Sequence, residues 1–191
     1  MLKEKSHMGE ADKVLKEIEG MTRRQFLPII GPRKGQVLVD VVRRIRPKRV
    51  LEVGTLIGYS AILIGKELGE DAELTTIEIH ADEAKEARQN IKRANIMPKV
   101  RVSVGDAIQI LPKLEGSFDL VFIDAGKSEY MDYLRLIEDR LHKRSVVVAD
   151  NAGIFADEMR DYLNYVRTSK RYNSKYVSVG DDGVEVSVRL A

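Results

Sequence analysis

Four polar residues, Asp124, Lys127, Asp150 and Asn151, follow the ends of two apolar segments, FDLVFI and SVVVA. Each segment is short, continuous and closed by a polar residue, which is typical of a buried parallel strand. Ligands of open parallel sheets bind outside the carboxyl ends of the strands, so three oxygen-bearing side chains and one ammonium are expected to converge there. Aspartate and asparagine are hard oxygen donors of the kind that Mg²⁺ or Mn²⁺ prefers. The pattern therefore predicts a divalent-metal site at this edge of a sheet.

The chain around these segments alternates between predicted strands and predicted helices. Strands are expected over about 49–54, 74–79, 100–104, 118–124 and 145–150, and helices between them over about 59–69, 81–95, 107–113 and 129–142. Two earlier helices are expected over about 10–20 and 36–46, with a turn-rich stretch at 26–35 between them. This alternation predicts an α/β protein with a parallel sheet and helices on both faces.

The C-terminal part follows a different pattern. A helix is expected over about 155–169, and it is followed by two alternating segments, YVSVG and VEVSVRL, around the turn from Gly180 to Gly183. Alternating segments that flank a glycine-rich turn predict an antiparallel hairpin. The parallel sheet is therefore expected to end in an antiparallel pair.

A glycine turn joins the first predicted strand to its helix, in the sequence EVGTLIGYSA. Gly54 and Gly58 permit close approach of the backbone and unusual φ angles. The helix that follows offers free N–H groups to an anion, and Ser60 can cap it and donate to a bound carboxylate. Leu56 stands where the dinucleotide fingerprint G-x-G-x-x-G has a glycine, so the turn argues against NAD.

Two further acids follow successive predicted strands. Glu78 lies about 20 residues beyond the glycine turn, where an acid accepts hydrogen bonds from ribose hydroxyls. Asp106 follows the third strand, placed to meet an adenine amino group. Each acid alone is as well explained as a helix cap, but signals at successive strand ends together predict a nucleoside site.

Composition restricts the class of protein. At 191 residues the chain suits one domain, and the absence of cysteine excludes disulfides, a thiolate zinc site and a cysteine nucleophile. There is no apolar run of membrane-spanning length, and the segment 1–13 has no apolar core typical of a signal peptide. The net charge is only +2, and nucleic-acid binders usually show a stronger basic bias. The basic cluster at 43–49 can be a solvated helix end or a phosphate-binding patch.

The motifs KGQVLVD, LEVGTLIGYSA, IEI, GDA, FDLVFIDAGKSEY and VVADN together resemble the metal-dependent O-methyltransferases of the catechol and caffeoyl-CoA type. The resemblance runs from about residue 25 to the C-terminus. It implies a Rossmann-like class I methyltransferase fold, doubly wound, with a mostly parallel seven-stranded sheet that ends in an antiparallel hairpin. It further implies one domain over 1–191, with an N-terminal helical cap or lid over 1–46 and a cofactor- and metal-binding α/β core over 47–191.

The resemblance also assigns roles to residues. S-adenosylmethionine contacts are expected from nine positions along the strand ends: Glu52, Gly54, Thr55, Gly58, Ser60, Glu78, Asp106, Ala107 and Asp124. A divalent metal, Mg²⁺ first and Mn²⁺ or Ca²⁺ as alternatives, is expected on Asp124, Asp150 and Asn151, with Lys127 as the general base. Many relatives read D-A-D-K where this chain reads D-A-G-K, so Gly126 removes a side chain beside the acceptor and leaves that site more open.

The expected activity is methyl transfer from S-adenosylmethionine to a hydroxyl of a small catechol-like or hydroxylated aromatic acceptor that chelates the metal. The alternative is methylation of RNA or protein on the same cofactor fold, and a third hypothesis is a non-enzymatic binder of the cofactor. Fold alone does not separate these. We further expect a cytoplasmic homodimer that acts on a small molecule, without a membrane and without nucleic acid.

Overall fold

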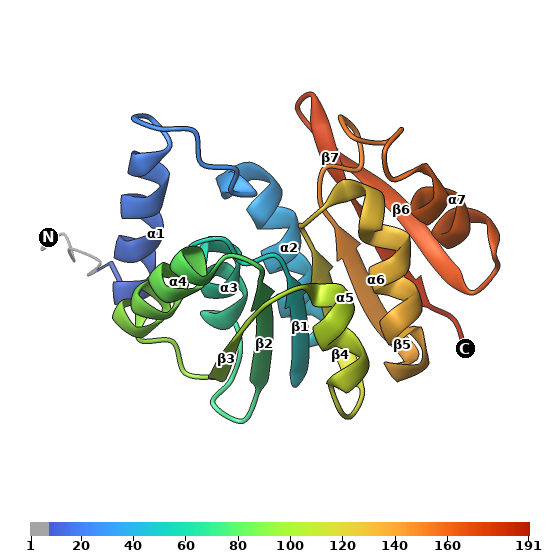
Figure 1. Ribbon diagram of the computed structural model, residues 1–191, viewed down its shortest axis with the longest axis horizontal. Helices are drawn as coiled ribbons and strands as arrows, with labels where there is room; N and C mark the ends of the chain where they lie inside the picture. Colours follow the sequence, from blue (N-terminus) through green and yellow to red (C-terminus); the bar gives the residue numbers. More distant parts are fainter. Residues whose placement is uncertain (1–7) are drawn as a thin grey trace, which may run out of the picture.

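The structure is a computed structural model that describes residues 8–191. Its centre is a seven-stranded sheet with the order β3-β2-β1-β4-β5-β7-β6 (Figure 1). The strands are β1 (Arg49–Val53), β2 (Glu73–Glu78), β3 (Lys99–Val104), β4 (Phe118–Ile123), β5 (Leu141–Ala149), β6 (Tyr172–Val179) and β7 (Asp182–Arg189). The first five pair in parallel, and β7 runs antiparallel between β5 and β6. The predicted α/β class, the mostly parallel sheet and the terminal antiparallel hairpin are confirmed.

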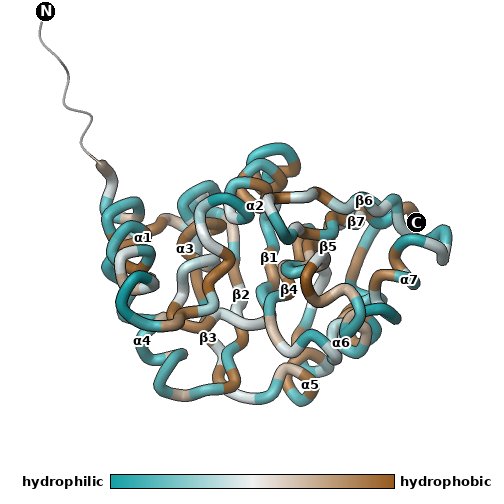
Figure 2. Tube along the Cα trace, turned by 90° about the horizontal axis from the view of Figure 1, so that it is seen from above, coloured by the Kyte–Doolittle hydropathy of each residue, from teal (hydrophilic) through white to brown (hydrophobic). Residues whose placement is uncertain are grey.

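Helices cover both faces of the sheet. They are α1 (Glu10–Met21), α2 (Gly31–Ile45), α3 (Tyr59–Gly65), α4 (Ala81–Ala94), α5 (Ala107–Ile110), α6 (Tyr130–Ile137) and α7 (Arg160–Thr168). Figure 2 shows α2 on one side of the strands and α5 and α6 on the other. The two faces bury separate apolar cores, one with α1 to α4 and one with α5 to α7. Because successive side chains of a strand point to opposite faces, a continuous apolar strand such as β4 supplies both cores.

The strand order reverses between β1 and β4. The chain runs outward from β1 through β2 to β3, and then returns to place β4 on the other side of β1. The registers pair Val53 with both Ile77 and Ile123, so the carboxyl ends of three strands lie level. In doubly wound sheets a crevice opens at this reversal, and ligands bind in it.

Three of the differences between predicted and observed boundaries bear on the site. Helix α6 ends at Ile137 and β5 already begins at Leu141, although the sequence predicts helix to about 142. The predicted helix over 155–169 begins only at Arg160, because 151–159 forms successive turns at the end of β5. Helix α2 begins at Gly31, inside the stretch predicted as turns, since Pro32 lies in its first turn, where a missing N–H costs nothing.

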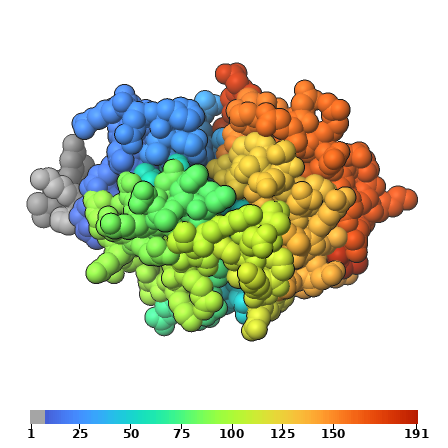
Figure 3. Space-filling view, in the orientation of Figure 1, coloured from blue at the N-terminus to red at the C-terminus, as the bar shows by residue number. Residues whose placement is uncertain are grey.

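The N-terminal helices belong to the same body as the sheet. Val14, Leu15 and Ile18 of α1 are buried in the core that α3 and α4 also share. The hydroxyl of Tyr59 on α3 donates to Glu19 of α1 at 2.6 Å. Figure 3 shows the blue N-terminal segment packed directly against the green segment that follows β2. The predictions for 1–13 and for 1–46 extend in part over residues 1–7, which lie outside the described range.

The basic cluster at the C-terminal end of α2, residues 43–49, forms contacts with carboxylates and a carbonyl. Arg43 pairs with Glu67 at 2.8 Å, and Arg49 donates to the carbonyl of Glu115 at 2.8 Å. Arg43 and Arg44 stand in the last turn of α2, where basic side chains complement the helix dipole. These contacts favour the helix-end alternative over a phosphate-binding patch. In the range 8–191, no helix combines the length and the apolar character that crossing a membrane would need.

Candidate active site

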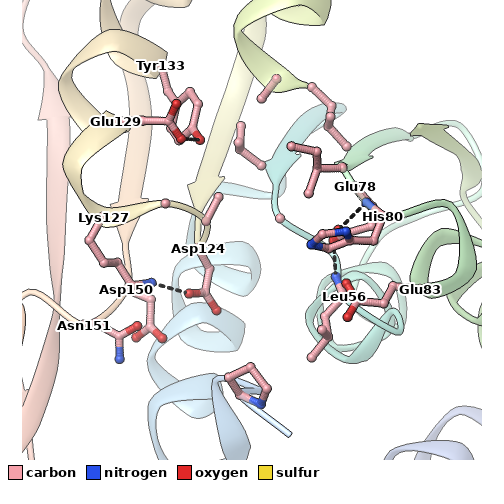
Figure 4. A pocket seen from close by; sticks show the side chains of 18 of the residues that line it. Leu56, Glu78, His80, Glu83, Asp124, Lys127, Glu129, Tyr133, Asp150 and Asn151 are labelled. Atoms are coloured by element: carbon pink, nitrogen blue, oxygen red, sulfur yellow. Dashed lines mark hydrogen bonds and ion pairs between the residues drawn. The ribbon is translucent and has the colours of Figure 1, made fainter. Parts of the chain in front are cut away.

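A cavity of about 900 Å³ opens at the carboxyl ends of β1, β2, β4 and β5 (Figure 4). One side of it carries Asp124, Lys127, Asp150 and Asn151, and the opposite side carries Glu78, His80 and Glu83. The connection between α1 and α2, from Phe26 to Ile29, lines its rim together with Ile154 and Phe155. The four polar residues that follow β4 and β5 therefore lie in one cavity.

Asp124 and Lys127 form an ion pair across the first turn after β4. Lys127 Nζ lies 2.8 Å from Asp124 Oδ1, and both side chains are about 15% exposed. The ammonium also donates to the hydroxyl of Tyr130 at 3.0 Å, and that hydroxyl lies 3.4 Å from the carbonyl oxygen of Asp150. Burial and the charges of Asp124 and Asp150 raise the pKa of Tyr130 well above 10, so its hydroxyl stays protonated. Tyr130 thus links the lysine to the neighbouring strand end.

Lys34 and Asp182 form hydrogen bonds to Asp150 and Asn151, the two residues that follow β5. Lys34 Nζ donates to Asp150 Oδ2 at 2.9 Å and to Asp182 Oδ2 at 2.7 Å. It is also 2.8 Å from Asp150 Oδ1, but that oxygen has no aligned donor. Asp182 accepts from the Asn151 Nδ2 at 2.9 Å and from the backbone N–H groups of Gly153 and Ile154. Because the amide nitrogen of Asn151 is committed to Asp182, its carbonyl oxygen is left for a ligand.

The ion pairs shift the acidity of this group of side chains. Burial raises the pKa of Asp150 to about 6, the charge of Asp124 adds to the rise, and Lys34 opposes it. Burial alone would lower the pKa of Lys34, but the two carboxylates that it contacts raise it overall. Burial also opposes ionisation of Asp182, yet its hydrogen bonds from Lys34, Ile154 and Asn151 lower its pKa well below the usual value. The raised pKa means that the charged form of Asp150 is disfavoured in this environment. A cation bound beside its carboxylate would stabilise that charged form.

These residues fit a divalent cation. Asp124, Asp150 and Asn151 offer carboxylate and amide oxygens, which are hard donors. Asp150 is only 2% exposed, and its Oδ1 has no hydrogen-bond partner among the described residues. Asn151 stands at φ 59°, in the left-handed region that asparagine tolerates better than most residues, and this conformation turns it beside Asp150. A buried carboxylate whose Oδ1 lies near the Lys34 ammonium but accepts no hydrogen bond, together with an oriented amide carbonyl, suits a small cation.

The glycine turn after β1 lies against the end of β4. Gly54 adopts φ 89°, and a Cβ there would collide with the carbonyl oxygen of Asp124. Leu56 also has positive φ, at 48°, and its N–H donates to Glu78 Oε2 at 2.8 Å. The other oxygen of Glu78 accepts from the N–H of His80 at 3.0 Å. The turn and the end of β2 are thus fixed to each other, and Glu78 is held at the cavity wall.

The predicted nucleoside residues divide into two groups. Gly54, Glu78, Asp106, Ala107 and Asp124 line the cavity, whereas Glu52, Thr55, Gly58 and Ser60 are not part of its lining. Asp106 also caps α5, since its Oδ1 accepts from the N–H of Ile108 at 2.8 Å. Asp106 is therefore both the cap of α5 and a residue of the cavity wall.

Glu52 lies behind the glycine turn and has no exposed surface. Its Oε2 accepts from Thr55 at 2.8 Å and from Thr76 by a shorter contact, and its Oε1 has no partner among the described residues. Burial raises the pKa of Glu52 to about 7, although the surrounding hydroxyls oppose the rise. Its place is therefore beneath the turn that would carry a ligand.

The cavity is strongly acidic. Its described lining has six carboxylates, Glu78, Glu83, Asp106, Asp124, Glu129 and Asp150, against a single lysine. One oxygen or nitrogen atom from each of Glu78, His80 and Glu83 lies within 4.8 Å of the others, although both oxygens of Glu78 already accept backbone hydrogen bonds. Such a field repels phosphates and favours cationic ligands.

Lys34, Asp182, Glu129 and Tyr133 were not among the predicted site residues. Lys34 stands in the motif KGQVLVD, but its 116-residue separation from Asp150 leaves no local pattern that would assign it a role. The space beside Gly126, which the sequence argument expected to be open, is taken by Glu129. A Cβ on Gly126 would lie only 2.6 Å from Glu129 Oε2.

Comparison with known proteins matches residues 4–188 to the O-methyltransferase family. Catechol O-methyltransferase B of Danio rerio is 35% identical over 203 aligned positions, which cover 99% of this chain and 76% of the relative. The structure of the O-methyltransferase TomG from Streptomyces achromogenes, in complex with SAM, superposes with a TM-score of 0.85 at 26% identity, over 94% of this chain and 91% of that one. An O-methyltransferase of Bacillus cereus in complex with SAH gives a TM-score of 0.83 at 26% identity, over 93% and 91% of the two chains.

Proposed function

Since the chain belongs to the O-methyltransferase family and is an S-adenosylmethionine-dependent O-methyltransferase of the catechol and caffeoyl-CoA type, we propose the reaction and the residues that carry it. The protein transfers the methyl group to a hydroxyl of a small catechol-like or hydroxylated aromatic acceptor that chelates a divalent cation. The observation that supports this proposal is the convergence of Asp124, Lys127, Asp150 and Asn151 in one acidic cavity.

The cofactor lies across the ends of β1, β2 and β3. Glu78 receives the ribose hydroxyls, Asp106 and Ala107 border the base, and the turn from Gly54 to Ser60 supports the methionine part. Glu52 and Thr55 act from beneath this turn, where they are hydrogen-bonded to each other at 2.8 Å. The acidic lining supports this placement, because the cofactor carries a sulfonium and an ammonium and no phosphate.

Asp124, Asp150 and Asn151 hold the divalent cation, with Mg²⁺ as the first candidate and Mn²⁺ or Ca²⁺ as alternatives. When bound, the cation acts as a Lewis acid that lowers the pKa of a coordinated hydroxyl and orients a chelating diol. Lys34 and Asp182 support this site from outside, since they fix Asp150 and the amide of Asn151. Phe26, Ile154 and Phe155 at the rim supply apolar surface against which an aromatic ring can pack.

Lys127 is the general base in this proposal. As the neutral amine it takes the proton of the acceptor hydroxyl, while the hydroxyl oxygen attacks the methyl carbon and the carbon–sulfur bond breaks. The products are the methyl ether and S-adenosylhomocysteine. Its position is held by Asp124 at 2.8 Å and Tyr130 at 3.0 Å, so the nitrogen is kept at the cavity wall. Holding acceptor and methyl donor in line can remove about 7–11 kcal/mol of the barrier in ideal cases.

The test is transfer of a labelled methyl group to a panel of catechols and monohydroxylated aromatics, with added Mg²⁺ and with excess EDTA. We expect transfer to vicinal diols that is lost in EDTA and restored by Mg²⁺. Full activity in EDTA, with no ion retained by metal analysis, contradicts the metal proposal. Transfer to RNA or protein and to none of the small acceptors contradicts the acceptor class.

We also propose that the protein is a cytoplasmic homodimer with an N-terminal cap over 1–46. The lack of cysteine suits a reducing compartment. The cap is supported by the segment Phe26–Ile29, which borders the cavity from the connection between α1 and α2. Light scattering of the purified protein tests the dimer, and protection of this segment from proteolysis by the cofactor tests the cap.

A further inference from the structure

The end of the cavity next to α5 and α6 carries two carboxylates with similar surroundings. Asp106 and Glu129 both line the cavity, and the one lysine of its described lining stands elsewhere, paired with Asp124. Asp106 Oδ1 accepts from the N–H of Ile108 at 2.8 Å, and Glu129 Oε2 accepts from the hydroxyl of Tyr133 at 2.7 Å. No described residue donates to the second oxygen of either. Both residues are exposed, so the second oxygen of each anchored carboxylate is free to accept from an N–H or O–H donor on a ligand.

Tyr133 is hydrogen-bonded to one of these acids and lies near enough to the other to feel its charge. It is only 4% exposed, and burial, its hydrogen bond to Glu129 and the charges of Glu129 and Asp106 raise its pKa. Its hydroxyl is therefore a permanent donor, and the carboxylate of Glu129 is held in one orientation. Figure 4 shows Tyr133 of α6 beside Glu129, which stands in the turn just before that helix, above Lys127 and Asp124.

Gly126 makes this arrangement possible. A Cβ at this position would lie 2.6 Å from Glu129 Oε2 and 3.6 Å from the Tyr133 hydroxyl oxygen. Any side chain there would thus displace the carboxylate, whereas glycine lets Glu129 fold over the backbone. Glycine at position 126 therefore lets a carboxylate from one turn later in the chain reach the cavity wall.

We propose that Glu129, positioned by Tyr133, recognises the exocyclic amine of the cofactor's purine base together with Asp106. This inference rests on the proposed function, which places the base at Ala107 between the ends of β2 and β3. The 6-amino group has two N–H donors, so each carboxylate can receive one. A purine that carries no donor at position 6 covers the second oxygen of each acid without offering it a hydrogen bond, which costs the water that this oxygen gives up.

The experiment is a double-mutant cycle between Glu129 and the amine, measured by calorimetry of the whole chain. The ligands are S-adenosylhomocysteine and its counterpart with hydrogen in place of the 6-amino group. For the wild type we expect loss of the amine to weaken binding about ten-fold or more, since a hydrogen bond to a charged acceptor contributes at least this much. For Glu129→Ala we expect weaker binding of the natural ligand and a markedly smaller additional loss when the amine is removed.

Two further variants complete the design. Tyr133→Phe leaves Glu129 in place but frees its carboxylate, so we expect an intermediate loss that depends on the amine. Asp132→Ala removes an exposed acid from the same helix outside this cavity, and its affinities are expected to match the wild type. If removal of the amine costs the same factor in the wild type and in Glu129→Ala, Glu129 does not contact the base. If the wild type binds neither ligand, the proposed function itself fails, so the two failures are distinct.

Discussion

The buried acid Glu52 makes a defined prediction about stability and pH. In the folded chain its pKa is about 7, against 4.5 for a glutamate in solvent, because burial disfavours the carboxylate. An acid with a raised pKa binds its proton more tightly in the folded chain than in the unfolded chain. Its contribution to stability is therefore complete below about pH 4.5 and is lost as the pH rises through 7.

The size of the effect follows from the same two values. At about 1.4 kcal/mol per pKa unit, the difference between 7 and 4.5 corresponds to about 3.5 kcal/mol of unfolding free energy. The perturbation is Glu52→Gln, which removes the titration and keeps an oxygen that can accept from Thr55 and Thr76. Relative to the variant, the wild type is expected to lose about 3 kcal/mol between pH 4.5 and pH 8.

The assay is urea denaturation of both proteins at several pH values, followed by circular dichroism without cofactor or metal. Comparison with the variant removes the contributions of other groups, among them Asp150, whose pKa is also raised. Glu73→Gln serves as a control, because that acid begins the neighbouring strand β2 and is exposed. A difference between wild type and Glu52→Gln that stays constant across this range would refute the reasoning.

Three further variants test the other parts of the site. Lys127→Ala should lower kcat about 10²–10⁴-fold with little change in S-adenosylhomocysteine affinity, and an unchanged kcat between pH 6 and 9 would show that it is not the base. Gly54→Ala should destabilise the protein by at least about 2 kcal/mol in urea denaturation, since it forces alanine to φ 89° against Asp124. The control is Gly20→Ala in α1, where nothing lies within 4 Å of the new Cβ, and this variant should be slightly more stable than the wild type. Lys34→Met should lower the free energy of unfolding by about 3 kcal/mol or more without divalent cation, because it leaves two nearly buried carboxylates uncompensated. Added Mg²⁺ should recover part of this loss. Equal stabilities of variant and wild type would show that the ion pairs are dispensable.

The order of strands and helices was accessible from the sequence because it depends on local patterns. Continuous apolar segments predicted the central strands, and the glycine-rich turn at 180–183 predicted the terminal hairpin, which β6 and β7 form. The parallel arrangement then required polar residues after successive strands to meet at one edge. Asp124, Lys127, Asp150 and Asn151 do share one cavity there, as the sequence argument expected.

Boundaries were less accessible where tertiary contacts override local preference. The sequence predicted helix to about 142, yet β5 begins at Leu141, where the register pairs Leu141 with Phe118 of β4. Likewise, Gly153 and Ile154 donate their N–H groups to Asp182 on β7, and this contact accompanies turns where the sequence predicted helix from about 155. A pairing with a distant strand has no signature in the segment itself.

The chain by itself therefore determined which side chains stand at the ends of the strands, because strand period and strand order follow from the pattern of apolar residues. Only the tertiary structure decided what surrounds them. Lys34 meets Asp150 across 116 residues and Asp182 across 148, and Glu129 enters the cavity because Gly126 leaves room for it. Such contacts depend on the packing of segments that no local pattern relates, and they set the charge, the orientation and the burial on which the chemistry depends.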